Sequence, residues 1–181
     1  MKRIAKFEKV SYEQFEKDYL DNLTNYENFS DEEKEVTIKE CHRIYDNIKL
    51  PKRATKGSAG YDFYLPYDIF IPTQTAVKVV TGIRCFIEDG WVLKAYPRSG
   101  HGFKFGVHLA NTVGIIDSDY YNSSNEGHIQ IKLVNDSRIA KDISLKECDA
   151  FCQGLFIEYG ITYDDDVEEI RDGGFGSTSK K

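Results

Sequence analysis

From residue 58 onward, the chain is a series of short segments rich in β-branched and aromatic residues and separated by turns. The segments are residues 61–65, 77–80, 83–87, 91–96, 129–134 and 151–159. In the fifth, Ile129, Ile131 and Leu133 alternate with polar residues, as in a half-buried strand. Many short strands of this kind predict an all-β sandwich or barrel. Asp89-Gly90, between two of these segments, predicts that they pair as a hairpin.

Residues 1–50 are instead acidic and helical in pattern. Ser11 followed by Gln14, and Ser30 followed by Glu33, match the capping box that begins a helix. Pro51 ends the region.

These patterns divide the chain into three parts. We expect a helical, acidic N-terminal extension over residues 1–50 and a β domain over residues 51–163. Residues 164–181 are acidic and then rich in glycine, too polar to pack as core, and by composition alone they predict a disordered tail.

Length and charge exclude several classes of function. The 181 residues suit one domain with a sizeable core. No apolar run approaches the ~20 residues of a membrane span, and the N-terminus is not a signal peptide, so we expect a cytosolic protein without membrane contact. The net charge of −6 argues against direct nucleic-acid binding, although converging cations could still bind a small anion.

The cysteine and histidine spacings predict no metal cage. The four cysteines form no CxxC pair, and the four histidines form no HExxH pattern. We expect buried free thiols, with a disulfide or a metal site as the alternatives, and surface or hydrogen-bonded histidines.

Residues 97–100, Pro-Arg-Ser-Gly, follow a predicted strand. The fork of donors on Arg98, the hydroxyl of Ser99 and the tight backbone that Gly100 allows could hold phosphate oxygens. An ordinary polar turn explains the tetrapeptide equally simply.

Residues 111–120 place an amide, two carboxylates and a phenol around a glycine. In a nucleotide site Asn111 would bond the base edge, Tyr120 would lie under the sugar, and Asp117 would act on a water molecule. The alternative is a strand with an exit turn at Asp117.

Two further segments are weaker signals. Residues 173–178 resemble a flexible linker, but an aromatic side chain such as Phe175 is unusual in a linker unless it packs against another group. Arg171 could pair with a terminal phosphate. The segment is not a P-loop. In residues 60–62, Asp62 is equally well explained as a turn cap.

Taken jointly and in order, five segments resemble the motifs of the trimeric dUTP diphosphatases, the dUTPases, of the bacterial and phage type. The segments are residues 59–62, 97–100, 114–120, 149–153 and 171–178. The resemblance implies a homotrimer of jelly-roll-like β-barrel subunits whose active sites each take motifs from all three chains. It also implies Mg²⁺-dependent hydrolysis of dUTP to dUMP and pyrophosphate, which limits uracil in DNA and supplies dUMP for dTMP synthesis.

On the nucleoside side, the resemblance implies that Asp117 is the general base for water attack on the α-phosphorus. Tyr120 would pack on the deoxyribose and collide with a 2′-hydroxyl. Asn111 and the backbone around Gly114 and Ile115 would read uracil.

On the phosphate side, the resemblance implies that Asp62 orients a water on Mg²⁺, which the three phosphates mainly hold, and that Gln153 supports the water network. Phe175 would close over uracil as the tail folds onto the site. The phosphate-binding residues would be Arg98, Ser99, Gly100, Arg171, Gly176, Ser177 and Thr178.

Three departures from the family pattern stand out. Ala150 replaces an arginine, so one phosphate contact is missing or comes from a residue such as Lys104. Arg171 lies one residue closer to the glycines than usual, and Ser179 replaces a glycine. The turn over residues 121–127 is longer than in shorter forms.

Several alternatives stay open from the sequence. The enzymatic rival is a dCTP deaminase of the same fold, and the non-enzymatic rival is a nucleotide-gated protein-binding regulator. Residues 1–50 lie outside the resemblance and could pack on the trimer, bind a protein partner, as extra segments of phage-type dUTPases sometimes do, or form a solvated appendage.

Overall fold

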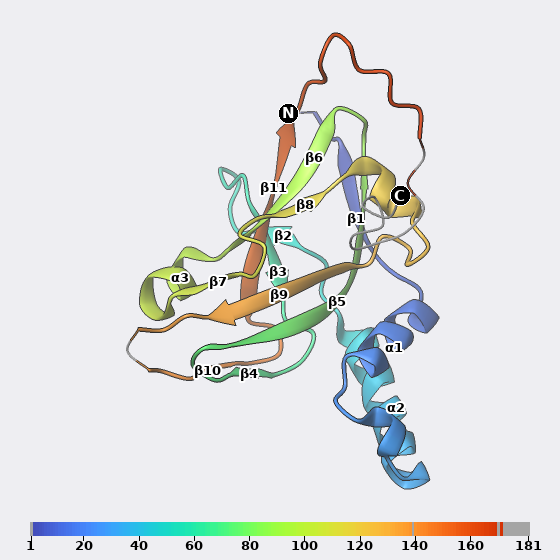
Figure 1. Ribbon diagram of the computed structural model, residues 1–181, viewed down its shortest axis with the longest axis vertical. Helices are drawn as coiled ribbons and strands as arrows, with labels where there is room; N and C mark the ends of the chain where they lie inside the picture. The colour runs from blue at the N-terminus through green and yellow to red at the C-terminus, as the bar shows by residue number, and fades with distance from the viewer. Residues whose placement is uncertain (1, 139, 170, 172–181) are drawn as a thin grey trace.

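The computed structural model describes residues 2–138, 140–169 and 171. Within them, two main sheets form, one of four strands in the order β1-β5-β9-β7 and one of five in the order β2-β3-β11-β6-β8, with a small β10-β4 pair beside them (Figure 1). The mainly β architecture predicted from the short segments is confirmed.

The element bounds are as follows. The strands are β1 (Ala5–Lys9), β2 (Lys52–Arg53), β3 (Tyr61–Tyr64), β4 (Ile69–Ile71), β5 (Thr75–Ile87), β6 (Trp91–Pro97), β7 (Val107–Leu109), β8 (Gly114–Ile116), β9 (Ile129–Asn135), β10 (Ile143–Leu145) and β11 (Ala150–Glu158). The helices are α1 (Tyr12–Asp21), α2 (Asp31–Asn47) and α3 (Ser99–Phe105), with 3₁₀ turns η1 (Tyr26–Asn28) and η2 (Ser118–Asn122).

The alternation in β9 is confirmed, because Ile129, Ile131 and Leu133 are all buried in the core. Residues 77–80 and 83–87, expected as two strands, form the single strand β5. Its pairing with β9 shifts register between Val80 and Ile83, so a β-bulge lies where the sequence suggests a break.

The hairpin expected at Asp89-Gly90 is wrong. The chain does turn there, with Gly90 at φ +83°, but β5 and β6 belong to different sheets. Both edges of β5 are already occupied by β1 and β9, so β6 pairs with β8 and β11 instead. A tight turn determines that the chain reverses, but not which strands pair.

Helices α1 and α2 begin where the capping signals predict. Ser11 accepts a hydrogen bond from the backbone N–H of Gln14, and Ser30 with Glu33 forms a complete capping box. No helix in the described part of the chain is long and apolar enough to cross a membrane.

The expectation of a solvated N-terminal appendage is wrong. Strand β1 was not expected from the sequence, and it pairs with β5 from Ala5 opposite Ile87 to Lys9 opposite Ile83. Phe15 of α1 and Cys41 and Ile44 of α2 are buried in the same core as the sheets. The N-terminal elements therefore complete the core of the β domain.

The cysteines are free thiols, as predicted. Cys41, Cys85 and Cys152 are buried, and Cys148 is partly buried. Burial raises the pKa of the Cys41 thiol to about 11 and that of Cys152 to about 12, so both stay protonated at neutral pH.

Phe15→Ala tests whether the N-terminal helices belong to the core. Removing this fully buried ring should lower the free energy of unfolding by about 3–5 kcal/mol in urea titrations. Val36→Ala on the exposed face of α2 is the control and should change it by less than about 0.5 kcal/mol. Equal, small effects of both substitutions would show that the helices do not stabilise the fold.

Candidate active site

A cavity of about 600 Å³ lies where β8 and the turn before it face β9. Four residues expected to bind the nucleoside line it together, namely Asn111, Gly114, Ile115 and Tyr120. Arg171, from the C-terminal segment, lines it as well.

Close packing of β8 on β6 forms one wall of this cavity. Gly114 lies opposite Ala95, and a Cβ atom at position 114 would lie only 3.1 Å from the Cβ of Ala95. Ile116 is buried while Ile115 is 54% exposed, as alternation along a strand requires. The segment is therefore a strand with an exit at Asp117, and it lines a cavity as well.

Tyr120 is held firmly in the cavity wall. The residue is only 8% exposed. Its hydroxyl donates to the carbonyl oxygen of His128 at 2.9 Å and accepts from Nδ2 of Asn125 at 2.8 Å. Burial raises the pKa of this phenol, so the ring is neutral and its position is determined by both hydrogen bonds.

Asp117 follows β8 at the N-cap position of η2, with its side chain 46% exposed. Arg171 donates to Oδ2 of Asp117 at 2.6 Å and to Oδ1 of Asp119 at 2.9 Å. Its guanidinium carbon also lies 5.7 Å from the centre of the Tyr120 ring. Arg171 thus reaches the expected site, where its partners in the structure are carboxylates.

A second group of predicted residues gathers on β3, β11 and β6. Gln153 of β11 lies opposite Asp62 of β3 and Tyr96 of β6. Nε of Arg98 lies 3.4 Å from Oδ1 of Asp62, and its Nη1 donates to the carbonyl oxygen of Ala150 at 3.4 Å. Asp62 is therefore within a strand and paired, which corrects its interpretation as a turn cap.

Ser99 and Gly100 begin the short helix α3, with Arg98 at its N-cap, so the turn expected at residues 97–100 is wrong. Both residues are exposed beside Arg98. The α3 helix ends at Gly106, whose φ of +68° is left-handed.

Comparison with known proteins agrees with this arrangement. Residues 46–179 match the family model for dUTPase. This chain belongs to the dUTPase family. The resemblance drawn from the motifs is thereby confirmed, and residues 1–45 lie outside the match.

The alignments with individual relatives cover most of the length of each relative. The deoxyuridine 5′-triphosphate nucleotidohydrolase of Lactococcus lactis is 35% identical over 134 residues, 72% of this chain and 88% of the relative. That of Finegoldia magna is 36% identical over 139 residues, 73% and 92% of the two chains.

Solved structures show the same fold. The crystal structure of the Streptococcus mutans dUTPase has a TM-score of 0.57 at 35% identity, covering 62% of this chain and 88% of that one. A dUTPase from phage phi11 of S. aureus has a TM-score of 0.56 at 20% identity, covering 68% and 92%, and shows the fold alone.

Two of the predicted site residues, Asp117 and Arg98, lie at opposite ends of β6. Ile116 pairs with Leu93, so Asp117 follows near the start of β6, whereas Arg98 lies just past its end at Pro97. About six residues at ~3.3 Å each separate the two levels, which is roughly 20 Å. One chain alone therefore does not bring Asp117 and Arg98 together.

Sequence reasoning missed two cations of the cavity lining, Lys78 and Lys132. They lie directly opposite each other on β5 and β9. Like charges in this position repel each other, so a nearby anion would be favourable. Only the strand register brings them together, and no local sequence signal marks it.

The remaining predicted site residues stay predictions. Phe175, Gly176, Ser177 and Thr178 lie outside the described residues. Lys104, considered as a substitute for the missing arginine, is exposed on α3.

Gly60→Ala tests whether the side-chain amide of Gln153 packs against the backbone at Gly60. A Cβ atom at position 60 would lie 2.8 Å from Oε1 of Gln153, the end of a flexible side chain. Gly60→Ala should therefore displace that amide in a crystal structure and change the melting temperature by no more than about 4 °C.

Gly154→Ala is the contrasting variant. Its Cβ would lie 2.7 Å from Leu93 and 3.0 Å from Phe63, both buried. It should destabilise the fold by about 1–3 kcal/mol. An undisturbed Gln153 in Gly60→Ala would contradict the close approach described here.

Proposed function

We propose that this protein hydrolyses dUTP to dUMP and pyrophosphate and so limits uracil in DNA and supplies dUMP for dTMP synthesis. The observation that carries the proposal is the cavity lined by Asn111, Gly114, Ile115 and Tyr120, whose lining residue Arg171 pairs with Asp117. Membership of the dUTPase family supports it.

Recognition of the base uses an edge strand. β8 is the last strand of its sheet in the described residues, and it pairs only with β6. The backbone groups of Gly114 and Ile115 on its free edge can therefore bond the uracil edge, as an added strand would. Asn111, exposed in the preceding turn, supplies an amide to the same base.

Recognition of the sugar uses Tyr120. Its ring is held by two hydrogen bonds to its hydroxyl, so it cannot easily move aside. A deoxyribose can pack against the ring, while a 2′-hydroxyl would collide with it. This contact favours dUTP over UTP.

Asp117 acts as the general base. Its partly exposed carboxylate, next to Arg171 of the cavity lining, can accept a proton from a water molecule. The water oxygen bonds to the α-phosphorus as the bond to the β-phosphate oxygen breaks, pyrophosphate leaves, and the proton passes to Asp117. Arg171 pairs with Asp117 in the structure, and it would turn to the outer phosphates when these are bound. Gly176, Ser177 and Thr178 would bind the phosphates beside it, and Phe175 would cover uracil.

The phosphates lie against Arg98, Ser99 and Gly100, with Gln153 supporting the water network. Mg²⁺ would be held mainly by the substrate phosphates and by water, as this ion usually is in such sites. Asp62 would orient one of its waters. When bound, Mg²⁺ neutralises phosphate charge.

The active form is a homotrimer of jelly-roll-like subunits. Asp117 and Arg98 are roughly 20 Å apart within one chain, so a complete site takes them from different chains. Exposed apolar side chains such as Phe70, Phe86 and Phe103 would be covered in such an assembly.

Product analysis decides between this function and deamination of dCTP. Incubation with each dNTP and Mg²⁺ should give dUMP and pyrophosphate from dUTP alone. Appearance of dUTP from dCTP would identify a deaminase. Tight dUTP binding with very slow turnover would identify a nucleotide-gated regulator.

Asp117→Asn should reduce kcat for dUTP by about 10²–10⁴, because the amide keeps the shape but cannot accept a proton. Binding of a non-hydrolysable dUTP analogue, measured by calorimetry, should persist. Asp119→Asn removes the other carboxylate partner of Arg171 and should cost less than about tenfold. A near-normal kcat in Asp117→Asn would refute the assignment.

Mixing two inactive variants tests the shared site. Asp117→Asn chains and Arg98→Ala chains should each be inactive, and co-refolding them should restore activity because mixed trimers can combine an intact Asp117 with an intact Arg98. Light scattering should give three times the 20.8 kDa chain mass. A fully active monomer would contradict this architecture.

A further inference from the structure

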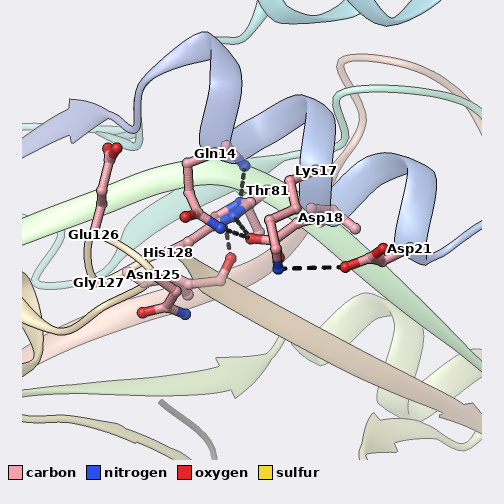
Figure 2. Close-up of polar contacts among 12 residues, drawn as sticks. Gln14, Lys17, Asp18, Asp21, Thr81, Asn125, Glu126, Gly127 and His128 are labelled. Carbon is pink, nitrogen blue, oxygen red and sulfur yellow. Dashed lines mark hydrogen bonds and ion pairs between the residues drawn. The ribbon is translucent and has the colours of Figure 1, made fainter. Parts of the chain in front are cut away.

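The N-terminal helix α1 is bound to the loop that follows Tyr120. This loop, residues 121–128, runs from η2 to the start of β9. Figure 2 shows Asp18 of α1 pointing at His128 in this region, with Thr81 and Asn125 close by. The contacts join a part of the chain outside the family match to the wall of the nucleoside cavity.

His128 is fully buried, and its hydrogen bonds define its protonation. The backbone N–H of Gly82 donates to Nε2 at 2.8 Å, so Nε2 carries the lone pair. Nδ1 therefore carries the hydrogen and donates to Oδ2 of Asp18 at 2.5 Å. The ring is neutral and is held from both sides, by β5 and by α1.

Asp18 is a strong acceptor at this position. Burial raises the pKa of its carboxyl, but hydrogen bonds from His128 and Gln14 outweigh burial, and the pKa is lowered overall. The carboxylate is therefore ionised, and its hydrogen bond to His128 is charge-assisted. Gln14, one turn earlier on α1, donates to the same oxygen at 2.8 Å.

The hold on His128 extends to the hydroxyl of Tyr120. That hydroxyl donates to the carbonyl oxygen of His128 and accepts from Asn125, both within the loop. The loop packs closely against the backbone of Tyr120. Gly127 has φ +69°, and a Cβ atom at this position would lie only 2.7 Å from the Tyr120 carbonyl oxygen. Movement of His128 would thus move Tyr120.

A second link holds the same loop. The two carboxylate oxygens of Glu126 accept from the backbone N–H and the hydroxyl of Ser11 at 2.8 and 2.6 Å. Ser11 is also the N-cap of α1. The start of the helix and its middle therefore both contact the loop.

We infer that Asp18 and His128 are positioning residues for Tyr120, so that α1 sets how strictly the cavity excludes a 2′-hydroxyl. The inference rests on the proposed function. It gives residues 1–45 a role in substrate selection, beyond their contribution to the core.

Asp18→Ala tests the link, with Asp21→Ala as the matched control. Asp21 is an exposed carboxylate on the same helix, and its ion pair with Lys17 at 3.4 Å does not involve the loop (Figure 2). Two measurements are made: hydrogen exchange of residues 120–128 without nucleotide, and the ratio of kcat/KM for dUTP to that for UTP.

Asp18→Ala should speed exchange in residues 120–128 and lower the dUTP-to-UTP ratio by about tenfold or more, because small misplacements of a positioning group are costly. Asp21→Ala should change neither. Asp18→Asn keeps an acceptor for Nδ1 of His128 and should restore most of the ratio. If Asp18→Ala does not fold, Asp18→Asn should show both effects at smaller size.

An unchanged ratio alongside faster exchange would overturn the inference, since the link would then serve stability alone. Unchanged exchange in a folded Asp18→Ala protein would overturn it as well. If the natural protein hydrolysed neither nucleotide, the proposed function would fail, while the exchange result would still report whether α1 holds the loop.

Discussion

The β-bulge at Thr81 and Gly82 in β5 is the constraint on which the arrangement depends. Gly82 has φ +70°, and a Cβ there would lie 2.3 Å from Ile48 and 3.2 Å from Phe15. The bulge frees the Gly82 N–H from the strand ladder, and His128 accepts it. Thr81 donates to the carbonyl oxygen of Ile129 at 2.6 Å. Both helices, β5 and β9 therefore meet at this one irregularity.

The bulge also connects core packing with the proposed chemistry. The N-terminal helices pack over Gly82, the ring of His128 lies between Gly82 and Asp18, and the carbonyl of His128 receives the Tyr120 hydroxyl. Each contact is buried, where hydrogen bonds are hard to replace with water. The position of Tyr120 thus depends on residues that the family match does not include.

Strand pairing holds Asp117 and Arg98 apart within one chain. Ile116 opposite Leu93 places Asp117 near the start of β6, while Arg98 follows its end. The proposed base and the proposed phosphate-binding arginine are therefore separated within one chain. Assembly of identical chains is the simplest way to bring such residues together, since one copy can supply what its neighbour lacks.

The sequence by itself determined the local features. Serine caps at Ser11 and Ser30 begin helices and alternation marks β9, because each of these features depends on neighbours along the chain. The segment of residues 111–120 was singled out in the same way, and four of its predicted site residues line one cavity. Tertiary structure alone decided the rest. The contacts that could not be predicted all join residues distant in sequence: the pairing of β1, the partners of β6, the opposed Lys78 and Lys132, and the Asp18–His128 pair. These contacts depend on which strand edges and buried donors remain available once the core has packed.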